Sequence, residues 1–211
     1  MYGFSVLLTL KKKGGEKMRK ILIAVMAMVS MLWFTTPTHA ALWDRGGGLI
    51  YDDVLNITWL QDANYAQTSG YDIDGRMTWY QATTWAANLN YYDSVRGVTY
   101  SDWRLPTALN QDGSGPCWGF NCTGSEMGHL YYTELGNMEG GPLSNTYPFI
   151  NLQSDDYWSG TEYSADSYVA RSFAFYNGFQ YAYNKDFSYS AWAVRPGDVV
   201  SAPVPEPATM L

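Results

Sequence analysis

The chain has 211 residues, of which 46% are hydrophobic and 17% aromatic, and its formal charge is −7. Six of the thirteen basic residues lie among the first forty positions, so the remaining 171 residues carry seven basic and nineteen acidic side chains, a formal charge of −12. Nucleic acid is not an expected partner, because its binding depends on Lys and Arg side chains that neutralise phosphates. The remaining length is that of one domain with a hydrophobic core.

The first forty residues have the pattern of an export signal. Basic residues precede an apolar run, 21–34, which is shorter than the ~20 residues that a membrane-spanning helix needs. Cleavage is predicted after Ala40, where small residues occupy the positions that signal peptidase recognises. We therefore predict a signal peptide at residues 1–40, with Met1 or Met18 as its start. The mature chain is expected in the periplasm, at the cell surface or secreted, with no stable membrane span.

The mature chain is predicted to open with two strands. Residues 49–51 and 57–60 are β-prone runs on either side of the turn-rich segment 52–56, which is typical of a hairpin. The segment 61–76 is polar and punctuated by glycines, so it predicts a loop.

Two helices are predicted in the middle of the chain. Thr78 and Gln81 match a capping box, which satisfies the first free amides of a helix. A second helix is predicted over 126–135, with Ser125 as its N-cap and Gly136 as its end. The apolar faces are predicted to consist of Trp79, Ala82, Trp85, Ala86 and Leu89 in the first helix, and of Met127, Leu130, Tyr131 and Leu135 in the second.

The last third of the chain predicts further strands. Residues 157–161 and 168–176 are β-prone, and Asn177-Gly178 favours a tight hairpin turn into a return strand that starts at Phe179. Residues 191–195 are predicted to close the sheet. This order of elements predicts an α+β domain over residues 41–200, with two helices packed on one side of a mostly antiparallel sheet.

Cys117 and Cys122 are the only cysteines in the chain. In an exported protein they are expected to form a local disulfide. A redox-active or copper-binding pair is the alternative, which the absence of a neighbouring Lys, Arg or His disfavours, since nothing in the loop would lower a thiol pKa.

Several short segments occur together in the order of a known family. They are Gly48-Leu49-Ile50-Tyr51-Asp52, Thr78-Trp79 with Ala82, Ser101-Asp102-Trp103-Arg104-Leu105-Pro106-Thr107, Tyr157-Trp158-Ser159-Gly160-Thr161-Glu162 and Ala193-Val194-Arg195-Pro196. Over roughly residues 46–197 the sequence resembles the C-terminal domain of the Legionella collagen-like adhesin. The resemblance implies a C-type lectin-like fold and a polysaccharide-binding role. Its structural motif would comprise Asp102, Trp103, Arg104, Leu105, Pro106, Trp192 and Arg195.

Residues 204–211 resemble the start of a PEP-CTERM sorting signal. Such signals occur on exported proteins of Gram-negative bacteria that make exopolysaccharide. The resemblance implies a sorting enzyme as a partner if a full-length tail exists. We expect residues 201–211 to form a disordered tail.

The aromatic residues of the closing strands are the main candidates for ligand contact. Because side chains alternate along a strand, about half of them must face outward, where sugar rings could stack on them. Packing in the core is the competing explanation. The predicted ligand-binding set is Tyr157, Trp158, Arg171, Tyr181 and Tyr183, with Tyr168, Tyr176 and Trp192 as further members of the aromatic group.

Three arginines stand in apolar surroundings, Arg104, Arg171 and Arg195. Each could present its planar donor group to a ligand carboxylate or sulfate. Internal ion pairs, for instance with Asp102 or Glu162, are the favoured interpretation, because a buried charge without a partner is costly.

Asp72 and Asp74, followed by Gly75, resemble the opening of a calcium-binding loop. No Glu closes the loop, so solvated acids are the favoured interpretation and no cofactor is expected, with Ca²⁺ as the alternative. No catalytic residue is predicted either. The mature chain has one histidine, His129, which excludes a three-histidine zinc site and is expected on a helix surface or in packing. The pair Asp155-Asp156 carries little information in so acidic a chain.

The sequence therefore predicts a non-enzymatic, exported binding or adhesion module that recognises glycan or exopolysaccharide. One alternative is an enzyme similar to formylglycine-generating enzymes, which would use Cys117 and Cys122. Another is a structural matrix protein without a discrete ligand.

Overall fold

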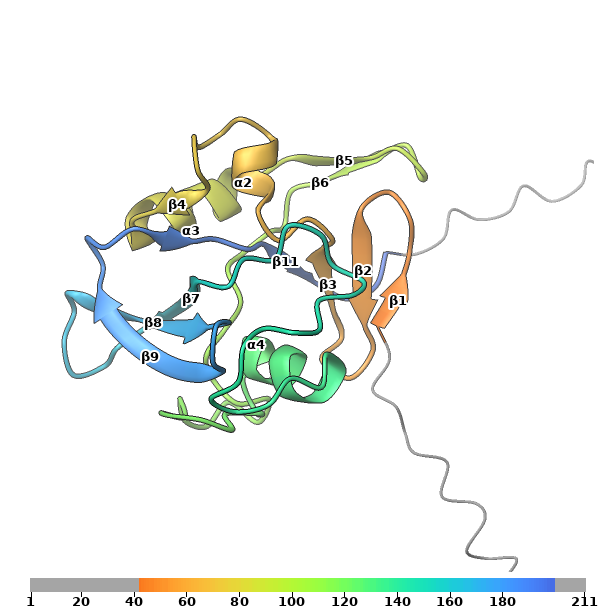
Figure 1. The fold of residues 1–211 in the computed structure, drawn as a ribbon. Helices are drawn as coiled ribbons and strands as arrows, with labels where there is room; N and C mark the ends of the chain where they lie inside the picture. Colours follow the sequence, from red (N-terminus) through yellow and green to blue (C-terminus); the bar gives the residue numbers. More distant parts are fainter. Residues whose placement is uncertain (1–41, 200–211) are drawn as a thin grey trace, which may run out of the picture. The chain divides into compact units, whose positions relative to one another are not determined.

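The computed structural model describes residues 42–199 (Figure 1). All described residues belong to one compact unit of the chain, Ala40–Leu211. The predicted signal peptide, 1–40, and the predicted tail, 201–211, lie outside the described residues. Within residues 42–199, no helix has the length and apolar character needed to cross a membrane.

The first sheet joins the two ends of the described chain. The predicted hairpin is present, and its second strand pairs with the last strand of the domain, Val194 lying opposite Trp59. All neighbours in this sheet are antiparallel. Its strands, in sheet order, are β1 (Leu42–Asp44), β2 (Leu49–Asp52), β3 (Ile57–Leu60) and β11 (Val194–Pro196).

The second sheet holds the strands predicted in the last third. The turn at Asn177-Gly178 connects two of them as expected, with Gly178 at a positive φ of 84° that suits glycine. Only the contact between β10 and β7 is parallel. In sheet order the strands are β4 (Arg76–Met77), β10 (Tyr189–Ser190), β7 (Asp156–Glu162), β8 (Val169–Ala174) and β9 (Phe179–Asn184).

The structure corrects two sequence predictions about these sheets. Residues 191–195 do not close the second sheet, because after β10 the chain crosses to β3, where the Leu60 amide donates to the Ala193 carbonyl. The segment 61–76 is not only loop, since it contains the short helix α2 (Tyr65–Thr68) and strand β4. Elements of four residues or fewer leave no periodic pattern that a sequence could reveal.

A separate two-stranded sheet was also missed. It consists of β5 (Tyr91–Asp93) and β6 (Val98–Tyr100), which pair in antiparallel register. Together the strands are mostly antiparallel and the helices few, so the domain has the α+β fold that the sequence predicts.

Both predicted helices are present. Helix α3 (Trp79–Asn88) begins with the capping box of Thr78 and Gln81 and buries Ala82, Trp85 and Ala86. The second predicted helix divides into α4 (Glu126–His129), capped by Ser125, and the π-helical turn η1 (Leu130–Glu134). Its predicted apolar face, Met127, Leu130, Tyr131 and Leu135, is buried.

Trp192 lies at the centre of the aromatic core. It follows β10 of the second sheet and precedes β11 of the first, and it is completely buried. Its indole nitrogen donates to the Leu60 carbonyl at 2.7 Å. Its ring contacts Trp59, Phe149, Tyr157 and Phe175 at centroid distances of 4.8, 4.8, 5.9 and 6.0 Å.

The motif residues 102–106 connect the core to the last strand. Arg104 pairs with Val194 through two backbone hydrogen bonds, and its guanidinium binds both oxygens of Glu126. Arg195 binds both oxygens of Asp102. Internal ion pairs are thus confirmed for Arg104 and Arg195, although the partner of Arg104 is Glu126.

Replacement of Trp192 tests the importance of this junction. We expect Trp192→Ala to lower the free energy of unfolding by ~3–5 kcal/mol, because it removes a buried ring and leaves a cavity. Trp118→Ala is the matched control, since the Trp118 side chain is exposed and its loss should cost less than ~1 kcal/mol. Urea unfolding measures both values, and equal losses would contradict the central role of Trp192.

Candidate ligand-binding surface

A row of aromatic rings follows strand β9 at the edge of the second sheet. Alternation along the strand places Phe179, Tyr181 and Tyr183 on one face. The rings of Phe179 and Tyr181 stack with centroids 4.1 Å apart and an interplanar angle of 28°. Those of Tyr181 and Tyr183 stack at 5.4 Å and 30°. The three rings therefore form a nearly parallel series that is only partly buried.

Other aromatic residues extend this series at both ends. Tyr189 and Phe187 contact Tyr183 at 4.8 and 6.3 Å, whereas Trp118 and Phe120 contact the Phe179 end. The exposed fractions are 55% for Trp118, 54% for Phe187 and 40% for Phe120. A contiguous surface of this kind is typical of an interaction site. We call it the aromatic strip, formed by Trp118, Phe120, Phe179, Tyr181, Tyr183, Phe187 and Tyr189.

The predicted disulfide is present and positions one end of the aromatic strip. Cys117 and Cys122 are bonded to each other, so neither thiol is free. Between them, Gly119 forms two backbone hydrogen bonds with Gln180 of β9. The Gln180 side chain also donates to the Cys117 carbonyl at 2.8 Å. The closed loop is thereby fixed against the edge of the sheet, with Trp118 and Phe120 on either side of the bonded glycine.

Arg171 lies beside the aromatic strip without an acidic partner. Its guanidinium carbon is 5.2 Å from the centre of the Trp118 ring and 4.8 Å from that of Tyr163. The residue is buried, and its Nε and Nη1 atoms have no hydrogen bond within residues 42–199. Burial lowers its pKa, an effect that the ring of Tyr163 partly opposes. The ion pair favoured for Arg171 is therefore a wrong prediction, because two aromatic faces surround the cation instead.

The other basic residues of the described chain are all paired with carboxylates. Six pairs account for them, and they leave Arg171 as the one cation in residues 42–199 that is not engaged with an acid. The pairs are Arg45 with Asp198, Arg76 with Asp155, Arg96 with Asp93, Arg104 with Glu126, Lys185 with Glu162, and Arg195 with Asp102.

A buried acid lies close to the tyrosine end of the aromatic strip. Burial raises the pKa of Asp156 to about 7, with the charge of Asp155 adding to the shift and Arg76 opposing it. Its Oδ1 atom has no hydrogen-bond partner among the described residues. Burial, and then the charge of Asp156, raises the pKa of Tyr183 well above its usual value and that of Tyr189 to about 12. The tyrosine hydroxyls thus remain protonated donors at physiological pH.

The structure separates the predicted ligand-binding residues into two groups. Tyr181, Tyr183 and Arg171 lie on or beside the aromatic strip. Tyr157 and Trp158 are completely buried, so the structure moves them from the predicted ligand surface into the core. Their strand, β7, lies inside the sheet, and its first four residues, 156–159, are buried, so the side chains on both faces of this half of the strand are covered.

The other members of the aromatic strip were not predicted as ligand contacts; they are Trp118, Phe120, Phe179, Phe187 and Tyr189. Trp118 and Phe120 flank Gly119 between two cysteines that are five positions apart in the sequence. This pattern could have predicted that both aromatic side chains are exposed. In so small a ring, large side chains have little room inside and must point outward. Phe187 and Tyr189 gave no such signal, because their contact with Tyr183 depends on how the chain returns after β9.

Asp72 and Asp74 bind the backbone of their own loop. Asp72 Oδ1 accepts from the amides of Asp74 and Gly75, and Asp74 Oδ1 accepts from the Arg76 amide. That last hydrogen bond is the main cause of the lowered pKa of Asp74. Asp62, the nearest preceding acid in the sequence, accepts from the Asn64 amide and from the Asn151 side chain. Calcium binding by this loop stays a prediction.

Residues 48–195 match the family model described as the Lcl C-terminal domain. The chain belongs to this family. No curated protein matches the sequence at a significant level. The match begins one residue before β2 and ends in β11, so it includes all of the first sheet except β1 and the last residue of β11, the whole second sheet and the whole aromatic strip.

The buried acid of this Lcl domain predicts a dependence of stability on pH. The folded state raises the pKa of Asp156 from 3.8 to about 7, so protonated Asp156 stabilises the fold and this contribution is lost as pH rises from about 4 to 8. Asp156→Asn should remove that loss, of which about 3 kcal/mol falls between pH 5 and pH 8. Urea unfolding at pH 5 and pH 8 measures it. Asp112→Asn, in an exposed loop, is the control, and an unchanged pH dependence in Asp156→Asn would contradict the assignment.

Because Arg171 has no acidic partner, we expect its replacement to have an unusual effect on the free energy of unfolding. Arg171→Met should leave the free energy of unfolding unchanged or raise it by about 1 kcal/mol, because it removes unsatisfied buried donors while the side-chain volume remains similar. Arg104→Met is the matched substitution and should cost about 2 kcal/mol, since it deprives the buried Glu126 of its partner. Thermal unfolding compares the two, and a larger loss for Arg171→Met would show that its interactions with aromatic rings are structural.

Proposed function

We propose that this Lcl domain is a non-enzymatic binding module that recognises polysaccharide outside the cell through its aromatic strip. The observation that carries the proposal is the series of nearly parallel, partly exposed rings along β9. Flat rings of this kind offer apolar faces on which sugar rings can stack, and the hydroxyls of Tyr181, Tyr183 and Tyr189 can donate to sugar oxygens.

The charge of the protein favours a neutral polysaccharide. The chain after position 40 has a formal charge of −12, and six of its seven cations are engaged in internal ion pairs. A densely sulfated ligand would meet a repulsive surface with only Arg171 to counter it. An uncharged exopolysaccharide, with at most an occasional carboxylate near Arg171, suits this surface better.

The disulfide and the family support a location outside the cytoplasm. Both are compatible with an extracellular protein. We also propose that the protein acts within an exopolysaccharide matrix. Processing by a sorting enzyme is a further proposal, and it depends on the segment after residue 200. The closed disulfide opposes the alternative of a formylglycine-generating enzyme, which would need reactive thiols at Cys117 and Cys122.

Binding measurements on the compact unit Ala40–Leu211 test the proposal. We expect saturable binding to neutral polysaccharides in a panel that also contains sulfated ones. Trp118→Ala and Tyr181→Ala should each weaken binding by ~5- to 30-fold, because an aromatic ring that contacts a bound sugar is expected to contribute about 1–2 kcal/mol. Tyr92→Ala is the control, since Tyr92 is an exposed tyrosine on the two-stranded sheet.

Three outcomes would decide against parts of the proposal. Saturable binding to no member of the panel would end it and favour a structural role in the matrix. Equal losses in Tyr92→Ala and Tyr181→Ala would place the ligand elsewhere. A preference for sulfated members would contradict the neutral ligand. The same titration with the calcium chelator EGTA decides whether the loop of Asp72 and Asp74 takes part.

A further inference from the structure

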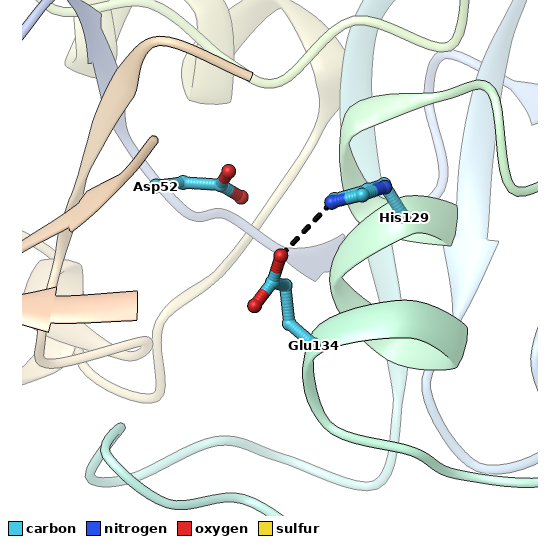
Figure 2. A group of neighbouring side chains, drawn as sticks. All are labelled: Asp52, His129 and Glu134. Carbon is cyan, nitrogen blue, oxygen red and sulfur yellow. Dashed lines mark hydrogen bonds and ion pairs between the residues drawn. The ribbon is translucent and has the colours of Figure 1, made fainter. Parts of the chain in front are cut away.

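Three side chains that can bind a metal ion meet between the first sheet and the second helix. Asp52 ends strand β2, His129 ends helix α4, and Glu134 ends the π-helical turn η1. One donor atom from each lies within 4.8 Å of the others. Figure 2 shows the Asp52 carboxylate facing the pair formed by His129 and Glu134, whose Nε2 and Oε1 atoms are 3.0 Å apart.

The π-helical turn explains how His129 and Glu134 come together. Residues five positions apart point to different sides of an ordinary α-helix, which turns about 100° per residue. The turn Leu130–Glu134 is wider, as the hydrogen bond from the Leu135 amide to the Leu130 carbonyl shows. It places Glu134 almost beneath His129. Such π-helical turns occur frequently at functional sites.

Two buried polar atoms at this cluster lack hydrogen-bond partners. Asp52 is completely buried, and although its Oδ1 accepts from the Leu55 amide at 2.9 Å, its Oδ2 has no partner within the described chain. The indole of Trp59 lies near this carboxylate and slightly lowers its pKa, yet Trp59 Nε1 makes no hydrogen bond of normal geometry. An unsatisfied buried carboxylate oxygen is costly, so an interaction that would satisfy it is expected.

We propose that Asp52, His129 and Glu134 bind one divalent transition-metal ion, with Zn²⁺ as the preferred ion. The ion would join the β2–β3 hairpin to the second helix. A water molecule would complete its coordination, and the Trp59 indole would donate to the Asp52 carboxylate as an outer partner that holds the ligand in place.

The donor set decides the class of ion. One imidazole nitrogen with two carboxylates suits Zn²⁺, and it offers too few oxygens for Ca²⁺, which takes six to eight. Two donors bound to one tetrahedral zinc are about 3.4 Å apart, given bond lengths of about 2.1 Å. His129 Nε2 and Glu134 Oε1, at 3.0 Å, already approach that separation. The Asp52 carboxylate lies within 4.8 Å of both donor atoms, so it is the third ligand within reach of the same ion.

Burial and charge at the cluster agree with a bound cation. Both partners of the pair are buried, with side-chain exposures of 8% for His129 and 1% for Glu134. Of the two positions expected for His129, a helix surface or the packed interior, the structure has the interior one. Asp52 is completely buried as well, and its carboxylate faces the pair of His129 and Glu134. A dication would offset the repulsion between the two carboxylates.

The competing explanation is an internal group without metal, in which His129 binds Glu134 and Asp52 is protonated. Metal titration of Ala40–Leu211 separates the two. After treatment with EDTA and desalting, the protein is titrated with Zn²⁺ by calorimetry. The zinc retained through gel filtration is counted by mass spectrometry. We expect one Zn²⁺ per chain and a higher melting temperature with Zn²⁺ than without it.

Variants of the ligands complete the test. His129→Gln and Glu134→Gln should each raise the Kd for Zn²⁺ at least about tenfold, since even the loss of an outer partner costs 10–100-fold. Asp52→Asn retains the shape of the side chain and should act in the same direction. Asp156→Asn is the matched control, because it neutralises a buried acid with a raised pKa and an unpaired oxygen outside this cluster.

The zinc measurements either support the proposed site or overturn it. One zinc per chain, lost in the ligand variants and kept in Asp156→Asn, supports the site. No zinc retained by the unaltered protein, an unchanged Kd in both Glu134→Gln and Asp52→Asn, or tighter binding of Ca²⁺ than of Zn²⁺ would overturn it. Because Glu134→Gln and Asp52→Asn preserve side-chain shape, the test stands even if His129→Gln fails to fold. Polysaccharide binding is not needed for any of these measurements.

Discussion

The packing of Trp192 is the interaction on which the rest of the structure depends. The residue stands where the chain leaves the second sheet and enters the first, and its indole donates to the Leu60 carbonyl at the end of β3. Its ring contacts aromatic residues of β3, of β7 and of the segments between them. One buried side chain therefore fixes how the first and last thirds of the domain meet, and a displaced Trp192 would separate two sheets that share one core.

The aromatic strip follows from that arrangement. With β7 and β8 held inside the second sheet, β9 becomes the edge, and an edge strand needs protection from unwanted pairing. Here the disulfide loop supplies it, because Gly119 occupies the hydrogen-bonding groups of Gln180. The same contact carries Trp118 and Phe120 to the surface. Edge protection and display of aromatic rings are thus achieved by one short loop.

The two proposed sites, the aromatic strip and the cluster of Asp52, His129 and Glu134, differ in the charged side chains they contain. Almost all basic side chains of the described chain form ion pairs within the domain, and some of their partners are buried acids, such as Glu126 and Asp93. Arg171 is held between two aromatic rings at the aromatic strip. Asp52 instead faces a histidine and a glutamate beside the second helix, and within residues 42–199 it forms no ion pair with an arginine or lysine. Unsatisfied polar atoms in this domain are found at both places, which is why each is a candidate for a ligand rather than for packing alone.

The sequence by itself determined the elements whose signals are local. Three features depend on neighbours within a few positions, and all are present: the capping box of Thr78 and Gln81, the turn at Asn177-Gly178 and the disulfide of Cys117 and Cys122. The α+β class follows from the order of the predicted elements along the chain, and it is confirmed too. The family, too, could be recognised from short motifs in order. Alternation even placed Tyr181 and Tyr183 on one face.

Only the tertiary structure decided which of the predicted site residues are exposed and which residues from distant segments contact one another. Alternation cannot tell an inner strand from an edge strand, so it could not separate the buried Tyr157 and Trp158 from the exposed rings. Alternation also could not predict that β11 pairs with β3, because the two strands come from opposite ends of the described chain. Asp52 and His129 are 77 positions apart, and the π-helical turn that brings Glu134 to them leaves no periodic mark. Contacts of this kind depend on the packing of distant segments, which local sequence patterns do not encode.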